Sequence, residues 1–387
     1  MISNINDAQN IFDLREMAKA RLPRWLFEFV DRGTEEEVAL RHNREAFDRI
    51  RLVPRTLVDV SARSQDITLF GKPQKMPIAI APTGAAGMMW YQGELELARA
   101  AKAAGIPFTL ATGSITSMEK VAAEAGGTLW MQLYMWADRS LSLELVRRAA
   151  ANGFEALLVT VDGVVAGNRE YNRRNGYSVP FRYNAKNSVD VLTHPGWLVN
   201  VLMRYLMNGG MPKRENYPEK LRDKITTGYG GTKETRTDSL NWDDLKALRD
   251  AWPGKLLVKG VLHPDDAERC VEYGADGVIV SNHGGRNCDA AVSPIEMLPD
   301  IVKAVGDRTT VIVDSGFRRG TDVVKALAMG AKTVLVGRPT LYGTAAAGEA
   351  GAARAIAIYR DEISRTMAQI CCNTVSEIDA GVLRRIV

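Results

Sequence analysis

The feature that most constrains the fold is a repeat of short apolar segments, separated by longer helical stretches, that begins near residue 77. Each of the eight segments is apolar or β-branched, as a strand covered on both faces requires. Eight successive strand–helix units predict an α/β fold, a TIM (β/α)8 barrel, rather than a doubly wound sheet. The segments are PIAIAP (77–82), FTLAT (108–112), LWMQLY (129–134), ALLVTVD (156–162), KLLVKG (255–260), GVIVSN (277–282), TVIVD (310–314) and TVLVG (333–337).

Helical spacing follows the first three strands, over residues 93–105, near 117–125 and near 140–152. We expect a single domain over residues 1–387, in which a helical N-terminal arm (1–76) precedes the barrel (77–345) and C-terminal helices (346–387) complete it. Residues 163–240 are too long for an ordinary loop after the fourth strand, so they are predicted to form an insertion.

The insertion contains a strongly apolar stretch, HPGWLVNVLMRYLMNGG (194–210). This stretch is either a helix packed on the barrel or at a subunit contact, an interfacial membrane contact, or a lid over the substrate.

Composition excludes several classes of function. The net charge is only +4, with Lys and Arg scattered among comparable numbers of Asp and Glu, so nucleic-acid binding is not expected. The four cysteines show no metal-binding spacing, which argues against a metal site and a disulfide framework. The N-terminus has no secretory signal pattern, and no apolar run reaches the length of a spanning helix. These features predict a cytoplasmic protein, peripheral to the inner face of the cell membrane if residues 194–210 contact lipid.

Chemically useful side chains stand where the predicted strands end. In a barrel these carboxyl ends converge on one face, which carries the active site. The residues concerned are Thr83, Gly84, Thr112, Gln132, Tyr134, Thr160, Asp162, Lys259, Ser281, His283, Asp314, Gly337 and Arg338.

Two glycine–arginine segments, DSGFRRG (314–320) and VLVGRP (334–339), follow the seventh and eighth strands. Loops at these strands commonly bind phosphate, and Arg318 or Arg338 could supply a guanidinium fork. The segments could also be simple turns. Since the chain lacks a Rossmann glycine fingerprint and a P-loop, the pattern favours another phosphate-bearing ligand.

His283, in the turn SNHGGRNCD (281–289), is the best candidate for a general base, because its ordinary pKa lies nearest to neutral pH. Asp162 either orients this histidine, as in catalytic triads, or caps a helix. Since both residues are predicted on one rim, the sequence favours the pairing.

Lys259 is either a Schiff-base nucleophile or a fixed cation beside developing negative charge. Arg286 and Arg169 could hold a carboxylate, and Tyr134 could hydrogen-bond a hydroxyl or carbonyl oxygen. Together these groups suit removal of hydrogen from a small anionic substrate onto a phosphate-bearing cofactor.

Over nearly its whole length the chain resembles the FMN-dependent (S)-2-hydroxy acid dehydrogenase and oxidase family. Within that family its details are most similar to the mandelate-oxidising members. The segments that carry the resemblance are APTG, MQLY, TVDGVVAGNRE, LLVKG, SNHGGRNCD, DSGFRRGTDVVKALAMGA and VGRP, in the family order.

The resemblance implies FMN as cofactor, oxidation of a 2-hydroxy acid to the 2-keto acid, and a homotetramer. It implies that His283 is the base and Asp162 its partner, that Arg286, Arg169 and Tyr134 bind the substrate, and that Lys259 stabilises the reduced flavin. It further implies that the flavin and its phosphate lie against Pro82, Thr83, Gly84, Thr112, Gln132, Thr160, Ser281, Asp314, Gly316, Arg318, Gly337 and Arg338.

Two positions refine this expectation. Gly84 stands where oxygen-using relatives usually carry alanine, which favours a dehydrogenase with a quinone-like acceptor. Phe29 stands where the family has a tyrosine that binds the substrate carboxylate, which predicts weak activity on glycolate or lactate and a preference for aryl or bulky substrates. The alternatives are an oxidase that reduces oxygen to hydrogen peroxide and an enzyme acting on a hydroxy ester or amide.

Two other functions compete with this interpretation. A flavin barrel of the type II isopentenyl diphosphate isomerase kind would need a diphosphate site and not the His283, Arg286 and Arg169 set. A non-catalytic descendant would use the insertion for membrane or partner contacts, but the intact set of candidate catalytic residues argues against it.

Overall fold

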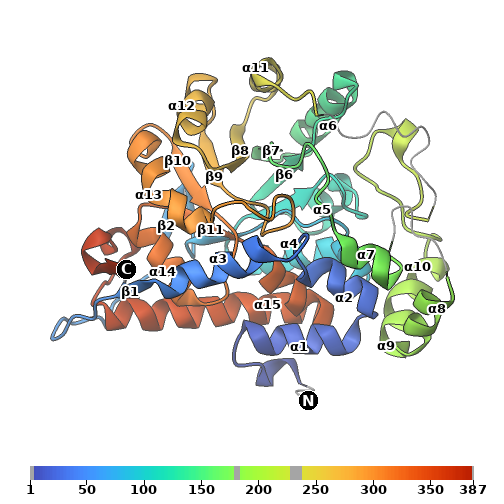
Figure 1. The fold of residues 1–387 in the computed structure, drawn as a ribbon, viewed down its shortest axis with the longest axis horizontal. Helices are drawn as coiled ribbons and strands as arrows, with labels where there is room; N and C mark the ends of the chain where they lie inside the picture. The colour runs from blue at the N-terminus through green and yellow to red at the C-terminus, as the bar shows by residue number, and fades with distance from the viewer. Residues whose placement is uncertain (1–3, 178–183, 227–237, 386–387) are drawn as a thin grey trace.

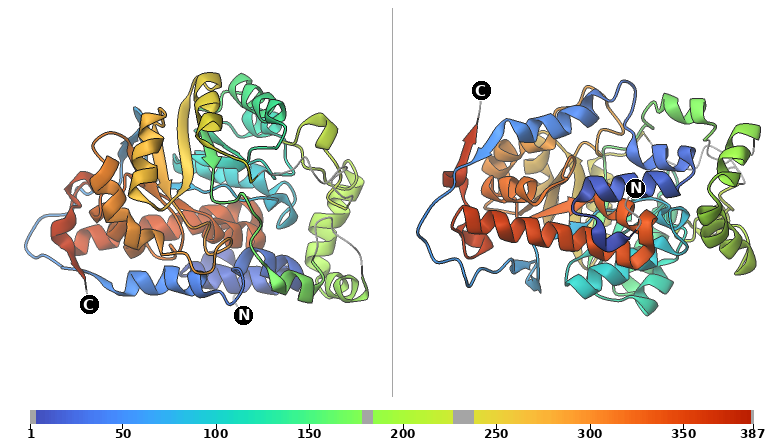
Figure 2. Two further views of the ribbon diagram at one scale, coloured as in Figure 1. Left: turned by 45° about the horizontal axis from the view of Figure 1, so that its top comes forward. Right: turned by 90° about the horizontal axis from the view of Figure 1, so that it is seen from below.

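The computed structural model describes residues 4–177, 184–226 and 238–385. Within them eight parallel strands close into a barrel, in which chain neighbours pair and the last strand pairs with the first (Figures 1 and 2). The predicted TIM barrel is therefore confirmed, and each predicted strand overlaps an observed one. The strands are β4 (Ile78–Ile80), β5 (Phe108–Ala111), β6 (Leu129–Leu133), β7 (Ala156–Thr160), β8 (Lys255–Val261), β9 (Gly277–Val280), β10 (Thr310–Val313) and β11 (Thr333–Val336).

Helices cover the outside of the barrel, and the three predicted after the first strands are present. The first of them ends at Gly105, whose φ of +68° and N–H bonds to the carbonyls of Ala101 and Lys102 form a glycine C-cap. The helices are α4 (Gly93–Ala104), α5 (Met118–Glu124), α6 (Arg139–Ala151), α11 (Trp242–Ala251), α12 (Pro264–Glu272), α13 (Pro294–Val305), α14 (Gly320–Ala328) and α15 (Arg338–Gln369), with the short turn η2 (Ala86–Met88) before α4.

The N-terminal arm is helical through Asp48, with η1 (Ile5–Asp7), α1 (Ile11–Arg21), α2 (Arg24–Asp31) and α3 (Val38–Asp48). The residues after it form three short strands, β1 (Ile50–Leu52), β2 (Ile67–Leu69) and β3 (Lys72–Gln74). The strand β1 pairs with a distant partner near the C-terminus, which is a pairing that local periodicity does not reveal.

The hairpin β2–β3 turns at Phe70 and Gly71, whose φ values of +51° and +80° are those of a tight hairpin turn. Its Leu69 belongs to the core inside the barrel, and the Phe70 ring lies 6.1 Å from that of Trp130. The hairpin therefore closes the amino-terminal end of the barrel and leaves the opposite end open.

The C-terminal part of the chain packs along the barrel. Helix α15 begins at the barrel rim rather than at residue 346, and a kink at Ala347 and Gly348 divides it. After it come η5 (Val375–Glu377), η6 (Ala380–Val382) and β12 (Leu383–Arg385), the last of which pairs antiparallel with β1. The segment that follows the N-terminal helices thus meets the C-terminal segment on the outside of the barrel.

The insertion after β7 lies at one edge of the molecule (Figure 1, yellow-green). It contains α7 (Glu170–Asn175), α8 (Ala185–Leu192), α9 (Pro195–Trp197), the π-helix η3 (Leu198–Met203), α10 (Arg204–Met207) and η4 (Glu219–Leu221), while its residues 178–183 and 227–237 lie outside the described part. Trp197 Nε1 donates to the carbonyl of Met88 at 2.7 Å, and Tyr205 Oη accepts from Gln92 N at 2.9 Å. Hydrogen bonds therefore dock the insertion on the barrel.

Among the described residues, none of the helices combines the length and the hydropathy that crossing a bilayer requires.

Candidate active site

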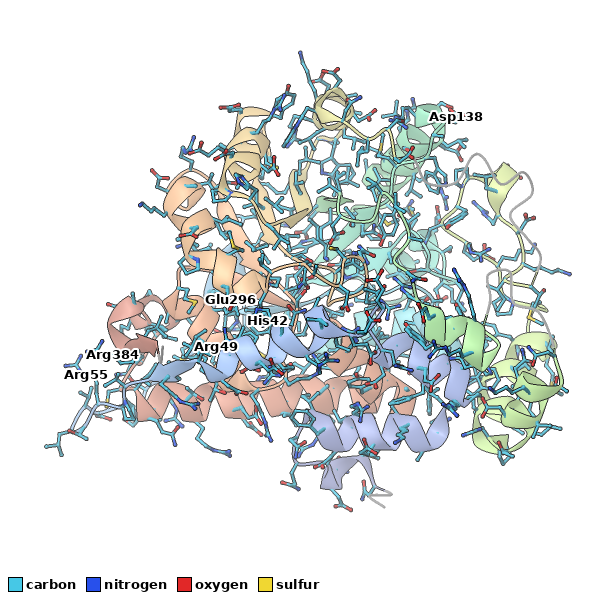
Figure 3. The ribbon with its side chains drawn as sticks, in the orientation of Figure 1. His42, Arg49, Arg55, Asp138, Glu296 and Arg384 are labelled. Carbon is cyan, nitrogen blue, oxygen red and sulfur yellow. The ribbon has the colours of Figure 1, made fainter. Side chains whose placement is uncertain are left out.

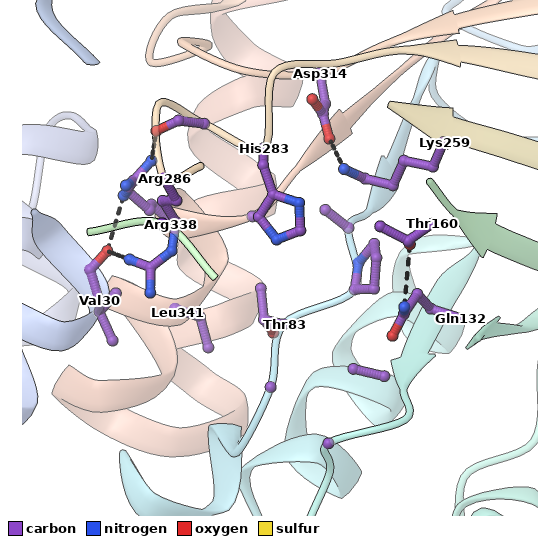
Figure 4. Close-up of a pocket in the computed structure, with 18 of the residues that line it drawn as sticks. Val30, Thr83, Gln132, Thr160, Lys259, His283, Arg286, Asp314, Arg338 and Leu341 are labelled. Atoms are coloured by element: carbon purple, nitrogen blue, oxygen red, sulfur yellow. Dashed lines mark hydrogen bonds and ion pairs between the residues drawn. The ribbon is translucent and has the colours of Figure 1, made fainter. Parts of the chain in front are cut away.

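A cavity of about 720 Å³ opens at the carboxyl ends of the barrel strands (Figure 4). Its wall brings together nearly every site residue predicted from the sequence, including Phe29 from the arm and Arg169 from the insertion. Of the predicted residues, Asp162 and Ser281 do not line it, but they bond to His283 and Lys259, which do. The fold thus gathers around one cavity residues that lie as far apart in the chain as Phe29 and Arg338.

His283 is the third residue after β9. Its φ of +57° is a backbone conformation that favours glycine. Its Nδ1 lies 2.9 Å from Asp162 Oδ1, so Nδ1 carries the proton and donates it to the carboxylate. Its Nε2 is then an acceptor, and Tyr134 Oη lies 3.2 Å from it. The imidazole is therefore held in one tautomer with its basic nitrogen on the cavity side (Figure 4).

Electrostatics keeps this pair in the form that a base requires. Burial lowers the pKa of His283 below its ordinary value, and the charge of Asp162 offsets this only in part. Burial alone would raise the pKa of Asp162, but the charge and hydrogen bond of His283, with Lys259 nearby, hold it below the ordinary value. At neutral pH the pair is therefore a neutral imidazole beside an ionised carboxylate.

Lys259 points from β8 into the cavity, where it is almost fully buried. Its Nζ lies 2.9 Å from Asp314 Oδ2 and donates to Ser281 Oγ at 2.9 Å. Burial would lower the pKa of this lysine, but Asp314 and Asp162 together raise it above the ordinary value. Lys259 is thus held as a cation, which favours the fixed-charge role over the Schiff-base role.

Two arginines hold the C-terminal end of α2 against the barrel (Figure 4). Arg286 Nη1 donates to the carbonyls of Phe29 at 2.7 Å and Arg32 at 3.2 Å, while Arg338 donates to Val30 at 2.8 Å and Arg32 at 3.0 Å. Burial lowers the pKa of each guanidinium to about 10, so both remain charged at neutral pH. The phosphate role of Arg338 stays a prediction, while these contacts make the arm a wall of the cavity.

Arg169 lies close enough to Arg286 for its charge to add to burial in lowering the pKa of Arg286. The Phe29 ring lies 5.1 Å from the guanidinium carbon of Arg286 and 4.9 Å from the ring of Tyr177. Two cations beside an aromatic wall suit a carboxylate that is attached to an apolar group.

The polar lining near β5, β6 and β7 is internally satisfied. Gln132 Nε2 donates to Thr160 Oγ1 at 3.0 Å, and Gln132 Oε1 accepts from Thr112 N at 3.1 Å. Such a network fixes the direction of each donor and acceptor before a ligand binds. A wall of fixed donors and acceptors suits a heteroaromatic ring that carries donors and acceptors of its own.

The residues present fit the predicted FMN. A Cβ added at Gly84 would meet no atom within 4 Å, so this wall leaves open space beside the polar network. The loop with Gly316 (φ +87°) and the first turn of α15 supply backbone N–H groups, and Arg318 lines the same space. This donor set matches a phosphate, and Lys259 supplies a cation for a ring that becomes anionic on reduction.

The sequence interpretation missed several residues that line the cavity, namely Met135, Trp136, Asn172, Arg173, Tyr177 and Tyr217. A signal existed for two of them, since Asn172 and Arg173 lie three and four residues after Arg169 at the start of α7 and so share its face. Tyr177 and Tyr217 lie in irregular parts of the insertion, and their place in the wall depends on long-range packing alone.

Comparison with known proteins supports the predicted resemblance. The family model described as FMN-dependent dehydrogenase matches residues 18–385. The chain is 42% identical to the (S)-mandelate dehydrogenase of Pseudomonas putida, over 97% of this chain and 95% of that protein. It is 38% identical to the L-lactate oxidase of a Nostoc species, over 98% and 99% of the two chains. A crystal structure of the monotopic membrane protein (S)-mandelate dehydrogenase superposes with a TM-score of 0.92 at 42% identity, over 98% of this chain and 100% of that one.

Proposed function

The chain belongs to the FMN-dependent dehydrogenase family, and from this premise we propose that it oxidises an (S)-2-hydroxy acid with an aryl or other bulky group to the 2-keto acid. The observation that carries the proposal is the neutral His283, bonded to Asp162, in the cavity that also holds Arg286 and Arg169. A base and two carboxylate-binding cations within one wall are what removal of hydrogen from a hydroxy acid needs.

Each side chain has a task that its position supports. FMN, when bound, supplies the two-electron acceptor for the oxidation. Arg286 and Arg169 bind the substrate carboxylate, and Tyr134 contacts the substrate oxygen. His283 Nε2 accepts a proton from the substrate, and Asp162 stabilises the imidazolium that results.

The Asp162–His283 pair predicts a pH effect. Because the charge of Asp162 raises the pKa of His283, Asp162→Asn should move the acid limb of the kcat/KM profile to lower pH. It should also lower kcat by about 10² to 10⁴-fold, since the imidazolium loses its counter-charge. Steady-state rates between pH 4.5 and 9 measure both effects, and a limb that moves to higher pH would contradict the assigned pairing.

Phe29 is proposed to set the substrate preference. Its ring covers Arg286 and contacts Tyr177, which gives the carboxylate pocket an apolar side with no hydroxyl donor at this position. Phe29→Tyr should restore that donor and raise kcat/KM for glycolate and L-lactate by about 10 to 150-fold, roughly the value of one hydrogen bond to a charged group. The gain for mandelate should be smaller. If the unaltered enzyme turns over glycolate faster than (S)-mandelate, the proposed preference is wrong.

The test of the function is anaerobic reduction of bound flavin. Purified protein should bleach on addition of (S)-mandelate, and mandelate methyl ester should separate the alternative of a hydroxy ester substrate. Bound flavin that no 2-hydroxy acid or ester bleaches would overturn the proposal.

The same reduced protein tests the electron acceptor. We propose a quinone-like acceptor, since Gly84 leaves open space at the position where oxygen-using relatives carry alanine. Faster reoxidation by a soluble quinone than by air-saturated buffer supports it. The opposite order, with formation of hydrogen peroxide, supports the second candidate, an oxidase like the L-lactate oxidase relative.

The insertion is proposed to contact a membrane surface. Val199, Met203, Leu206 and Met207 are 58%, 41%, 45% and 72% exposed, and their spacing places them on one helix face. The mandelate dehydrogenase with which the structure superposes is described as monotopic, which supports this interpretation.

Flotation with vesicles of phosphatidylcholine and phosphatidylglycerol tests the contact. The protein should float with the vesicles, and the double variant Leu206→Ser/Met207→Ser should lose at least about tenfold in partitioning, by the area rule for apolar burial. Leu57→Ser removes a more exposed apolar side chain outside the insertion and should leave the partitioning unchanged. Equal loss in both variants would contradict an insertion-specific contact.

We also propose a homotetramer, which light scattering of the purified protein tests directly.

A further inference from the structure

The turn that carries His283 has one backbone bond of its own, from Gly285 N to the carbonyl of Asn282 at 3.1 Å, and an unusual backbone conformation. His283, Gly284 and Gly285 have φ values of +57°, +66° and +70°, so three successive residues lie in the left-handed region. A histidine in this region is held against a conformational preference for the ordinary right-handed or extended regions. Surrounding contacts must therefore define where the imidazole lies.

Asp162 and Tyr134 contact the ring itself, and the side chain of Asn282 holds the turn that carries it. Asn282 Oδ1 accepts from Gly285 N at 3.2 Å, which closes the turn across His283. Its Nδ2 donates to the carbonyl of Val292 at 3.1 Å, which ties the turn to the segment before α13. Asn282 is 4% exposed, so these bonds form in an environment with little competing water.

Asn43 of helix α3 completes the bonding of Asn282. Asn43 Nδ2 donates to Asn282 Oδ1 at 2.9 Å, and Asn282 Nδ2 donates to Asn43 Oδ1 at 2.7 Å. This reciprocal amide pair joins residues 239 positions apart, and Asn43 has no exposed surface. Because both amides are committed to each other, Asn43 fixes the orientation in which Asn282 holds the turn.

Helix α3 also approaches the loops after β9 and β10 at backbone contact distance. A Cβ at Gly285 would lie 2.6 Å from Leu40 N, and a Cβ at Gly316 would collide with the carbonyl oxygen of Asn43. Arg44 Nη1 donates to the Gly316 carbonyl and bonds to Asp322 Oδ2 at 2.6 Å. The helix therefore serves as one rigid support for both loops.

We infer that Asn43, which lies outside the barrel and does not touch the cavity, is a positioning residue that acts through Asn282 on His283. The inference rests on the proposed role of His283 as the base. A side chain with no chemistry of its own thus determines where Nε2 stands relative to the substrate.

The test measures kcat, KM and the acid limb of kcat/KM for the holoenzyme with (S)-mandelate. Asn43→Ala should lower kcat by about 10 to 100-fold with a smaller change in KM, the size that follows from misplacing a catalytic group by about an ångström. The acid limb should move to higher pH, because a loosened turn exposes the imidazole whose pKa burial lowers. The ionisable groups around it, Asp162, Tyr134, Lys259 and Arg286, are unchanged in this variant.

Two further variants separate positioning from packing. Asn43→Leu fills the space without the amide bonds, so it should share the pH shift of the alanine variant. Asn43→Ala/Asn282→Ala should cost no more in kcat than the worse single variant, because the two amides act as one unit. Additive costs with an unmoved acid limb would overturn the inference.

His42→Gln is the matched control on the same helix. His42 Nε2 lies 2.7 Å from Glu296 Oε2 on α13, with Arg49 also near that carboxylate (Figure 3), and it bonds to neither loop. The kcat of the His42→Gln variant and the acid limb of its kcat/KM profile should equal those of the unaltered enzyme. If His283→Gln retains activity, the proposed function fails; if that variant is inactive while Asn43→Ala is normal, only the present inference fails.

Discussion

Replacing His283 by glutamine is expected to lower kcat for (S)-mandelate by about 10⁴-fold, the upper end of the range for a lost general base. Glutamine can still accept and donate hydrogen bonds near Asp162 and Tyr134, but it cannot take a proton at neutral pH. The effect should be large because His283 is the one histidine among the described residues that line the cavity.

KM should change little in this variant, since Arg286 and Arg169 remain in place. Stopped-flow anaerobic flavin reduction measures the chemical step directly. His263→Gln is the control, because the His263 side chain is 64% exposed and caps α12 outside the cavity. A His283→Gln rate within tenfold of the unaltered enzyme would mean that another group takes the proton.

Lys259→Met is the second substitution with a large expected effect. It removes the positive charge from a pair whose side chains are 6% and 9% exposed, and it leaves the Asp314 carboxylate buried without its cation. Breaking one partner of such a pair typically costs about 3 to 5 kcal/mol in the free energy of unfolding. The variant should also lose at least about 10²-fold in the rate of flavin reduction, because the cation beside developing negative charge is absent.

The double variant Lys259→Met/Asp314→Leu separates these two losses. It removes both charges, so it should recover most of the unfolding free energy while the slow flavin reduction persists. Thermal and urea unfolding measure the first quantity, and stopped-flow absorbance measures the second. If the unfolding free energy and the rate of flavin reduction both recover, Lys259 contributes to stability and gives no electrostatic assistance to the reaction.

The barrel was predictable because its strands are encoded locally. Each of the segments from PIAIAP to TVLVG is predominantly apolar or β-branched, as burial on both faces demands, and a residue such as Gly105 ends the helix that follows. Such signals depend only on neighbours within a few residues. The strands β1 and β12 carried no comparable signal, because each exists only through pairing with a segment more than 300 residues away in the chain.

The positions of the candidate site residues on the barrel strands were predictable for a related reason. Residues directly after strands, such as Thr112, Lys259 and His283, must reach one rim once the strands form a barrel. The wall formed by Tyr177 and Tyr217 was not predictable, since their positions in the insertion follow no repeat. The bonds of Arg286 and Arg338 to α2 likewise join side chains to carbonyls more than 250 residues away.

The sequence by itself therefore determined the barrel, the rim on which the chemistry lies and the residue types available there, because short-range periodicity and burial dictate them. Only the tertiary structure decided which partner each side chain has. It placed Lys259 on Asp314 and Asn43 against Asn282, and it determined that Nδ1 is the nitrogen through which His283 forms the pair with Asp162 that the sequence favoured. Those pairings depend on the distance and direction between elements far apart in the chain, and no local pattern contains that information.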